Sequence, residues 1–118
     1  MTSSHDPQVL KGVLSLLLLQ LLAERESYGY ELVQRLHEIG LVDVLEGTVY
    51  PALARLERET RVSARLVSSK TGPARKYYRP TLAGYEALAT QTANWFHLAG
   101  IVGAALNRAL PAEPTKGS

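Results

Sequence analysis

The chain has 118 residues, a length typical of one domain, and its hydrophobic content of 46% is enough for a buried core. It contains no cysteine, which excludes disulfides, thiolate metal sites and a cysteine nucleophile. The longest apolar stretch, Val13 to Ala23, is shorter than the roughly 20 residues of a membrane span and follows no basic segment of the kind a secretory signal has. We therefore expect a soluble, cytoplasmic protein that does not contact a membrane.

The net charge of +2 hides a strong asymmetry along the chain. The segment from Thr48 to Arg79 contains eight basic and two acidic residues and so carries +6, whereas the remainder contains five basic and nine acidic residues and carries −4. Such segregation of charge indicates a polyanionic partner. On charge alone, the alternative is a basic face that is only solvated.

The first 45 residues predict two helices. Residues 7–25 are apolar almost all round, so this helix must be covered on several sides. Ser27 is a favourable N-cap for a second helix with apolar residues at helical spacing, and Gly40 stands where a C-terminal glycine is expected. Residues 41–45 are too short for a helix and could form a brief strand.

A third helix is predicted to begin at residues 47–51, where Pro51 is tolerated because the amides of a first turn lack intrahelical partners. Its buried stripe is Val49, Leu53 and Leu56. From residue 62 the pattern alternates as in a half-buried strand, with Val62, Ala64 and Leu66 on the buried face.

Residues 70–73 have the composition of a turn, and residues 75–79 form an aromatic-rich return strand. Pro80 fits only at the end or edge of such a strand. These features predict a hairpin with a basic tip.

Thr81 is then an N-cap for a last helix that runs to about Arg108, and its 26 residues from Leu82 to Asn107 include one charge, Glu86. A surface helix should show a charged face, so we expect a partner chain to cover this one. Two-fold pairing would bury it against its symmetry mate and the first helix. The predicted interface residues are Leu14, Leu18, Leu88, Trp95, Val102 and Leu106.

The order of elements predicts a mainly α (α+β) fold, a winged helix-turn-helix with a β-hairpin wing and a long C-terminal dimerisation helix. The expected organisation is a DNA-binding domain over residues 7–80, the dimerisation helix over 81–108, and flexible termini at 1–6 and 109–118.

The third helix and the hairpin carry the groups that DNA binding requires. A helix fits the major groove, where side chains near its start reach base edges, and cations on a wing reach phosphates. Packing of Tyr50 and simple solvation of the arginines are the alternative. The predicted contacts are Thr48, Tyr50 and Arg55 on the helix and Lys70, Gly72, Arg75 and Lys76 on the hairpin.

Several segments together resemble the PadR family in order and spacing over roughly Leu10 to Leu106. They are Leu10-Lys11-Gly12, Tyr28-Gly29-Tyr30-Glu31, residues 47–53, Arg55-Leu56-Glu57 and residues 72–79, with Thr81 and Gly84 following. The resemblance implies a homodimeric transcriptional repressor that binds a palindromic operator in double-stranded DNA. It places Thr48, Tyr50 and Pro51 on the recognition helix, and Lys70, Gly72, Arg75 and Lys76 on the wing.

The resemblance also places Tyr28 and Tyr30 at the start of the second helix, where core packing and phosphate contact both remain open. Some short members of the family enclose a hydrophobic pore that binds planar drugs. The resemblance therefore implies a small aromatic effector that releases the repressor, with Trp95, Phe96 and Ala99 as ligand-binding residues. The alternative for Trp95 is an anchor in the dimer interface.

The chain departs from the family at the end of the third helix, where relatives usually have glycine followed by an apolar residue. Here the pair is Thr60-Arg61. A β-branched residue resists positive φ at a cost of about 1 kcal/mol. Either the helix ends by another geometry or the junction is strained.

Nothing in the sequence predicts an enzyme, a metal site or a cofactor, because His5, His37 and His97 lack metal-ligand spacing and the glycines form no phosphate-binding loop. Two alternatives to a DNA-binding regulator remain. One is a winged-helix protein–protein interaction module, against which the basic segment argues, and the other is a ligand-binding dimer without DNA binding.

Overall fold

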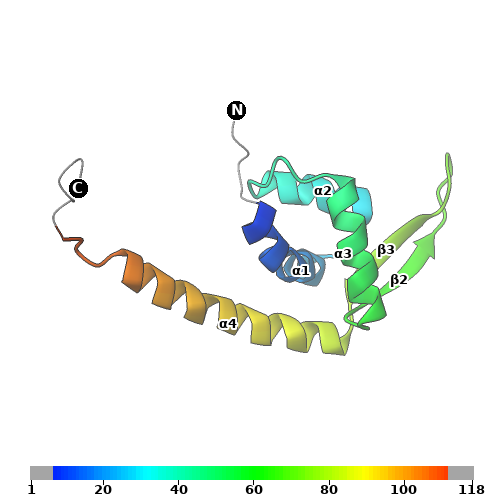
Figure 1. The fold of residues 1–118 in the computed structure, drawn as a ribbon. Coiled ribbons are helices and arrows are strands. Elements are labelled where there is room, and N and C mark those ends of the chain that lie inside the picture. Colours follow the sequence, from blue (N-terminus) through cyan, green and yellow to red (C-terminus); the bar gives the residue numbers. More distant parts are fainter. Residues whose placement is uncertain (1–6, 112–118) are drawn as a thin grey trace.

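The computed structural model describes residues 7–111, which form four helices and one three-stranded antiparallel sheet (Figure 1). The elements are α1 Pro7–Glu24, β1 Ser27–Tyr28, α2 Gly29–Glu38, α3 Glu46–Arg58, β2 Val62–Val67, β3 Arg75–Pro80 and α4 Leu82–Leu106. The predicted order of helices and hairpin is confirmed, and with it the winged-helix fold. Flexible termini were predicted at 1–6 and 109–118, of which residues 1–6 and 112–118 lie outside the described residues.

Helix α1 is the centre of the core, and it is covered by α2, α3 and the sheet. Its apolar residues occur on all sides because several elements contact it, as the sequence predicts. Leu18 and Leu19 are fully buried. The start of helix α4 also contacts α1, where Ala87 and Leu88 pack half-buried against this core, and the one buried residue of α4 is Gly84.

The N-cap predicted at Ser27 is wrong, because Ser27 belongs to β1, a strand that the sequence did not reveal. This strand pairs with β3, so the sheet order is β1-β3-β2. The Ser27 hydroxyl is buried and accepts a hydrogen bond of 2.9 Å from Arg35, whose guanidinium also donates to Glu24 at 3.1 Å. A buried guanidinium needs such acceptors. The Ser27 hydroxyl therefore accepts a hydrogen bond from Arg35 and does not cap α2.

Three other local predictions are also wrong. Residues 41–45 form a loop rather than a strand. Leu66 is 72% exposed, because β2 extends beyond the core into the wing, while Val62 at its start is buried as predicted. Pro51 is the sixth residue of α3 rather than part of its first turn, so the Gly47 carbonyl cannot receive the usual helical hydrogen bond from that position.

Helices α2 and α3 end in the same backbone motif. In both, the second residue after the C-cap donates to the carbonyl five positions earlier at 2.9 Å, the pattern of a Schellman turn. The motif needs a residue with positive φ, which is Gly40 (φ 118°) after α2 and Thr60 (φ 57°) after α3. The junction that replaces glycine by threonine therefore keeps the usual geometry and bears backbone strain.

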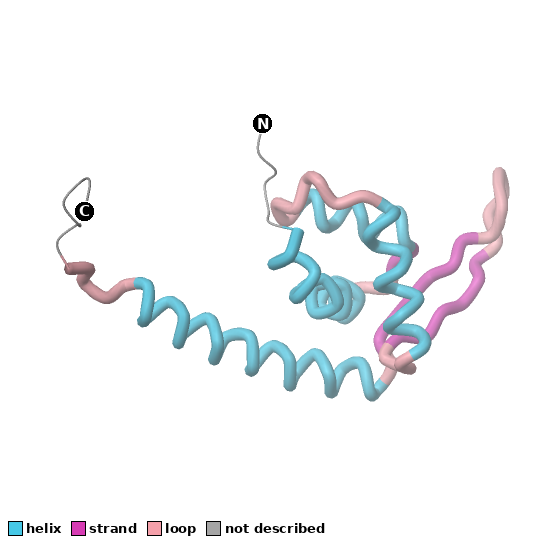
Figure 2. Tube along the Cα trace, in the orientation of Figure 1, coloured by secondary structure: helices cyan, strands magenta, loops and turns pink. Residues whose placement is uncertain are grey.

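Helix α4 begins at its predicted cap, since the Thr81 hydroxyl accepts from the Gly84 amide at 3.1 Å. The helix then extends away from the rest of the chain (Figure 2). The radius of gyration is 18.6 Å, against about 13.5 Å for a compact domain of this length. No helix in residues 7–111 has the length and apolar character needed to cross a membrane.

Candidate functional site

The start of α3 presents polar and apolar side chains to solvent, while its opposite face is buried. Thr48 and Pro51 are exposed, and Tyr50 is 44% exposed. The predicted stripe of Val49, Leu53 and Leu56 is completely buried against the core, as expected. This burial sets which face of the helix points outward.

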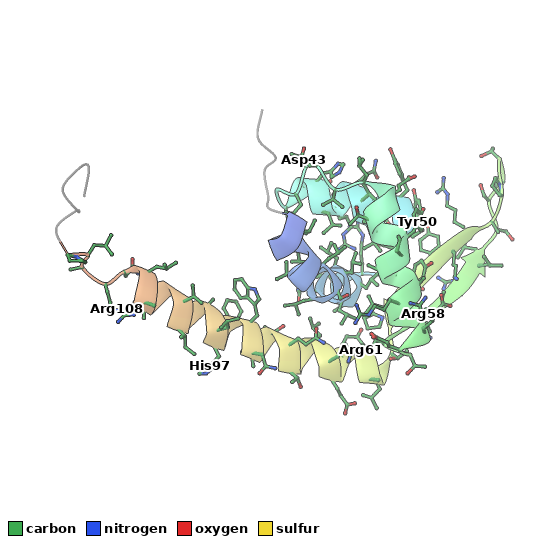
Figure 3. All side chains as sticks on the ribbon, in the orientation of Figure 1. Asp43, Tyr50, Arg58, Arg61, His97 and Arg108 are labelled. Atoms are coloured by element: carbon green, nitrogen blue, oxygen red, sulfur yellow. The ribbon has the colours of Figure 1, made fainter. Side chains whose placement is uncertain are left out.

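Tyr50 connects α3 to the start of α2 (Figure 3). Its ring packs so closely on Gly29 that a Cβ there would lie 2.3 Å from the ring. The phenol lies at the first turn of α2, a helix whose N-cap residue makes no side-chain cap. Burial raises the pKa of Tyr50 above its usual value. Tyr50 therefore packs against the start of α2 and still keeps an exposed part.

The wing places its cations beside α2 and α3. The guanidinium of Arg75 lies 4.7 Å from the centre of the Tyr28 ring, a cation–π contact. Lys76 forms an ion pair of 3.0 Å with Glu57 of α3, and this hydrogen bond raises the pKa of Lys76. Lys70 and Gly72 are exposed at the hairpin tip. The wing is thus held against α3 at its base while its tip projects into solvent (Figure 1).

Four of the predicted site residues meet at one hollow of about 380 Å³, between the start of α2, α3 and β3. They are Tyr28, Tyr50, Arg75 and Lys76, and the other lining residues are Gly29, Ala74 and Tyr78. These last three residues were not predicted from the sequence as site residues. A glycine between two tyrosines at a helix start was the available signal for Gly29.

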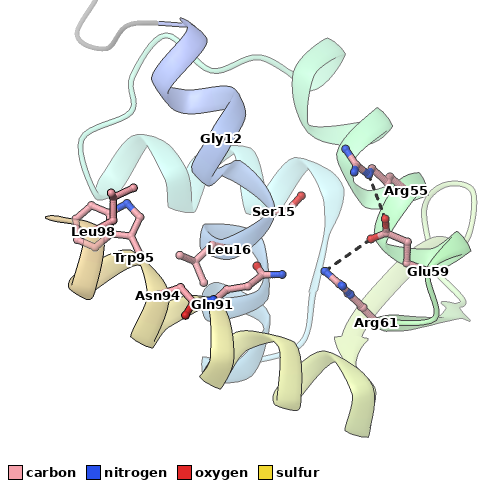
Figure 4. Close-up of a pocket in the computed structure, with 10 residues that line it drawn as sticks. All are labelled: Gly12, Ser15, Leu16, Arg55, Glu59, Arg61, Gln91, Asn94, Trp95 and Leu98. Atoms are coloured by element: carbon pink, nitrogen blue, oxygen red, sulfur yellow. Dashed lines mark hydrogen bonds and ion pairs between the residues drawn. The ribbon is translucent and has the colours of Figure 1, made fainter. Parts of the chain in front are cut away.

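Arg55 is not brought into this group. It forms an ion pair of 3.2 Å with Glu59, one helical turn further along α3, and lines a second hollow between α1, α3 and α4 (Figure 4). Its side chain remains 69% exposed. Tyr30 is also outside the first hollow and is 49% exposed.

Trp95 lies between two hollows beside α4. It lines the hollow that contains Arg55 and a separate apolar one of about 390 Å³ against α1, which Phe96 also lines. The Trp95 and Phe96 rings pack edge to face with centres 5.2 Å apart. Ala99, the third predicted ligand-binding residue, lines neither hollow.

The residues predicted for a dimer interface fall into two groups. Leu14 and Leu18 lie in the protomer's own core, with exposures of 5% and 0%, which removes them from the surface open to a partner. Leu88 packs against that core, whereas the α4 side chains further along are exposed. The exposed members of the predicted set are Trp95, Val102 and Leu106.

Residues 7–111 contain no group of three or more histidine, aspartate or glutamate side chains that could hold a metal ion. His37 has a structural contact, since its Nε2 atom lies 2.6 Å from the Val44 carbonyl oxygen. His97 is exposed on α4.

Comparison with known proteins agrees with this geometry. Residues 18–90 match the sequence model of the transcriptional regulator PadR-like family. The solved structure of a PadR-like transcriptional regulator from Bacillus cereus is 37% identical, aligns over 86% of this chain and 99% of that one, and has a TM-score of 0.78. A PadR family regulator from Eggerthella lenta is 32% identical over 86% and 88% of the two chains, with a TM-score of 0.79. An uncharacterized protein from Lysinibacillus sphaericus is 29% identical over 96 residues, 80% of this chain and 88% of that protein.

Proposed function

Because the chain belongs to the PadR-like family of transcriptional regulators, which are DNA-binding proteins and not enzymes, we propose that it is a sequence-specific repressor, active as a homodimer and released by a small aromatic effector. The observation that carries the DNA-binding part is the hollow where α3 and the wing meet. Tyrosines and cations from three elements share one outward surface there. Phosphate groups of a duplex are suitable partners for such a surface.

The proposal assigns different roles to the helix and the wing. Thr48, exposed near the start of α3, would reach base edges in the major groove, with Pro51 beside it. Arg75 and Lys76 would contact phosphates, and Lys70 at the tip would extend that contact along the groove, with Gly72 allowing close approach. Tyr28, Tyr30, Tyr50 and Arg55 would border this surface.

The dimer proposal divides the chain into a DNA-binding domain, residues 7–80, and a pairing helix, residues 81–108. Helix α4 carries large exposed apolar side chains along its length, among them Phe96 (65%) and Leu106 (79%). A contiguous apolar surface of this kind is typical of an interface. A two-fold partner would cover it and place two copies of α3 about one DNA turn apart, roughly 34 Å.

The effector proposal is supported by Trp95, which is 45% exposed and borders both hollows beside α4. A flat indole packs well on a planar ligand, and the apolar hollow has a suitable volume.

A gel-shift assay with the palindromic site nearest to the protein's own gene tests the DNA-binding function. Wild type should shift the site, and the shift should weaken at higher salt by about 0.9 log units per log unit of salt for each phosphate contact. The double variant Arg75→Glu/Lys76→Glu should weaken binding to all sequences alike, whereas Thr48→Ala should change the preference among sites. A control for net charge is Arg108→Glu, at an exposed cation beyond α4, which changes the charge by half as much as the double variant.

Unchanged DNA affinity in the double variant would show that the wing does not contact DNA. A wild-type protein that binds no palindrome at low salt would favour a protein–protein module or a ligand-binding dimer. Sedimentation at several protein concentrations tests the dimer, and a monomer at micromolar concentration would contradict it.

A further inference from the structure

The two faces of the three-stranded sheet differ in what covers them. Successive residues of a strand point to opposite faces, so the pairing register assigns every side chain of β2 and β3 to one face. Val62, Tyr78 and Pro80 share the face that is buried against the helices. Lys76 extends the same face toward the hairpin tip, where it pairs with Glu57 of α3. This inner face of the sheet is therefore turned toward α3.

We call the opposite face the outer face of the sheet, and it is rich in arginine. Its arginines are exposed and make up three of the five basic residues of the hairpin. The carboxylate of Glu26 lies beside them, so these four charged groups together carry +2. The members of the outer face are Tyr28, Ser63, Arg65, Val67, Arg75, Tyr77 and Arg79.

Two of these arginines, Arg65 and Arg79, differ in how their charges are compensated. The Glu26 carboxylate accepts two hydrogen bonds from Arg65, one from its Nε atom at 2.9 Å and one from a terminal nitrogen at 2.6 Å. The hydrogen bond from Arg65 is the main reason why the pKa of Glu26 is lowered, and the charge of Arg79 acts in the same direction. Arg79 forms no ion pair with another side chain of residues 7–111, so its guanidinium retains its donors for a ligand.

The outer face also has a hollow of about 240 Å³, which both of these arginines line. Ser63 and Tyr77 line it as well, and each has a hydroxyl group that can donate a hydrogen bond. The Tyr77 ring packs edge to face on Tyr28 with centres 5.2 Å apart, and Arg75 lies over the Tyr28 ring. Guanidinium and hydroxyl donors are the groups with which proteins bind the phosphate oxygens of DNA.

The outer face is on the side of the hairpin that is turned away from α3. Helix α4 leaves the base of the hairpin and runs toward the side of the molecule opposite the hairpin tip (Figure 1). In a dimer paired through α4, the two hairpins would therefore stand at the outer ends, beside the DNA that flanks the operator. Arg75 and Arg79 are separated by about 13 Å of strand, which equals about four nucleotides of a DNA strand.

We propose that the outer face of the sheet binds the phosphate backbone of DNA beyond the outer end of each half-site, with Arg65 and Arg79 as the phosphate-binding residues. Ser63 and Tyr77 would add hydroxyl donors, whereas Glu26 would weaken the contact because its carboxylate occupies Arg65. The contact is independent of sequence, because phosphates carry no base information. The inference rests on the proposed DNA-binding function and extends the interface from the palindrome to its flanks.

Fluorescence anisotropy of the full-length chain with two duplexes tests the inference. Both contain the palindromic site nearest to the protein's own gene. The short duplex ends at the outer ends of the half-sites, and the long duplex has eight further base pairs on each side. Wild type should bind the long duplex about fivefold more tightly or better, whatever the flanking sequence. The slope of the logarithm of the dissociation constant against the logarithm of the salt concentration should be larger for the long duplex, by about 0.9 for each added phosphate contact.

Variants of the outer face should change this preference for the long duplex. The double variant Arg65→Gln/Arg79→Gln should lose it and bind both duplexes about equally. Glu26→Gln should increase it by about twofold to fivefold, because the change releases Arg65, and it provides the test if the double variant does not fold. The matched control is Arg58→Gln/Arg108→Gln, which removes two exposed cations outside the outer face and should retain the preference of wild type.

Equal affinity of wild type for the two duplexes, or a full preference for the long duplex in the double variant, would overturn the flanking contact and leave the DNA-binding function in place. A gain that depended on the flanking sequence would overturn the backbone contact in favour of base recognition. If wild type bound neither duplex at low salt, the proposed DNA-binding function itself would fail, and the flanking contact with it.

Discussion

The phenol ring of Tyr50 covers the α-carbon of Gly29, and a methyl group at that carbon would lie 2.3 Å from the ring's Cε1 atom and 2.7 Å from its hydroxyl oxygen. Helix α3 therefore meets the start of α2 through a contact that glycine allows without displacing the tyrosine ring. The same tyrosine ring lines the hollow in which Arg75 and Lys76 lie. The packing of α3 on α2 and the proposed DNA-binding surface thus share one side chain.

Gly29→Ala should displace Tyr50 and lower operator affinity by tenfold or more. The clashing atoms belong to the end of a side chain that can move, so the free energy of unfolding should fall by only about 1–2 kcal/mol. Affinity is measured by gel shift and stability by urea denaturation. The control is Tyr50→Phe, which retains the ring and loses only the hydroxyl. Its free energy of unfolding should fall by about 1 kcal/mol or less. Operator affinity equal to wild type in Gly29→Ala would show that the ring's position is unimportant for binding.

Glu57→Gln should strengthen DNA binding to specific and non-specific sequences by about twofold to fivefold. The Glu57 carboxylate pairs with Lys76 at 3.0 Å, so it offsets one cation of the proposed interface and would repel phosphate. The ion pair is exposed and contributes little to stability, on the order of 0–1 kcal/mol, so folding should be unaffected. The slope of the logarithm of the dissociation constant against the logarithm of the salt concentration should rise by about 0.9, the value for one additional phosphate contact. Glu86→Gln on α4 is the charge-matched control, and an equal gain there would attribute the effect to net charge alone.

Thr60→Gly should raise the free energy of unfolding by about 1 kcal/mol, because glycine adopts the φ of 57° without the clash that a β-branched residue has. Urea denaturation measures the gain, at fixed protein concentration because the stability of the proposed dimer would depend on concentration. The reciprocal variant Gly40→Thr introduces strain of the same kind after α2, where φ is 118°. Its free energy of unfolding should fall by at least as much as that of Thr60→Gly rises. A Thr60→Gly protein that is less stable than wild type would mean that the threonine side chain contributes more than its backbone conformation costs.

Gly84→Ala should lower the free energy of unfolding by about 3 kcal/mol or more, or prevent folding, because an added Cβ would overlap sterically with the Arg61 carbonyl group. The obstacle is backbone, which cannot move without shifting the junction between α3 and β2. Gly47→Ala is a matched first-turn glycine with open space around it, and it should be neutral or slightly stabilising. Thermal unfolding followed by circular dichroism compares the two. Similar melting temperatures would contradict the close approach of α4 to this junction.

The sequence alone predicted the order of the four helices and the hairpin, and it predicted a basic segment, because each rests on local patterns. Helical spacing of Leu53 and Leu56, alternation from Val62 and the Thr81 cap are all short-range signals. The segregation of charge into residues 48–79 was also readable without a fold.

Long-range contacts were decided by the tertiary structure. The pairing of β1 with β3 joins residues about fifty positions apart, and Ser27 consequently faces Arg35 instead of capping a helix. The separation of Arg55 from Arg75 depends on how α3 rotates against the core, which buries one stripe and points neighbouring residues to different hollows. Local patterns determine which face of an element is apolar, whereas the packing of elements against each other determines which distant side chains meet. For this reason the sequence predicted a basic DNA-binding surface, and only the fold revealed a second, cationic and aromatic hollow beside α4.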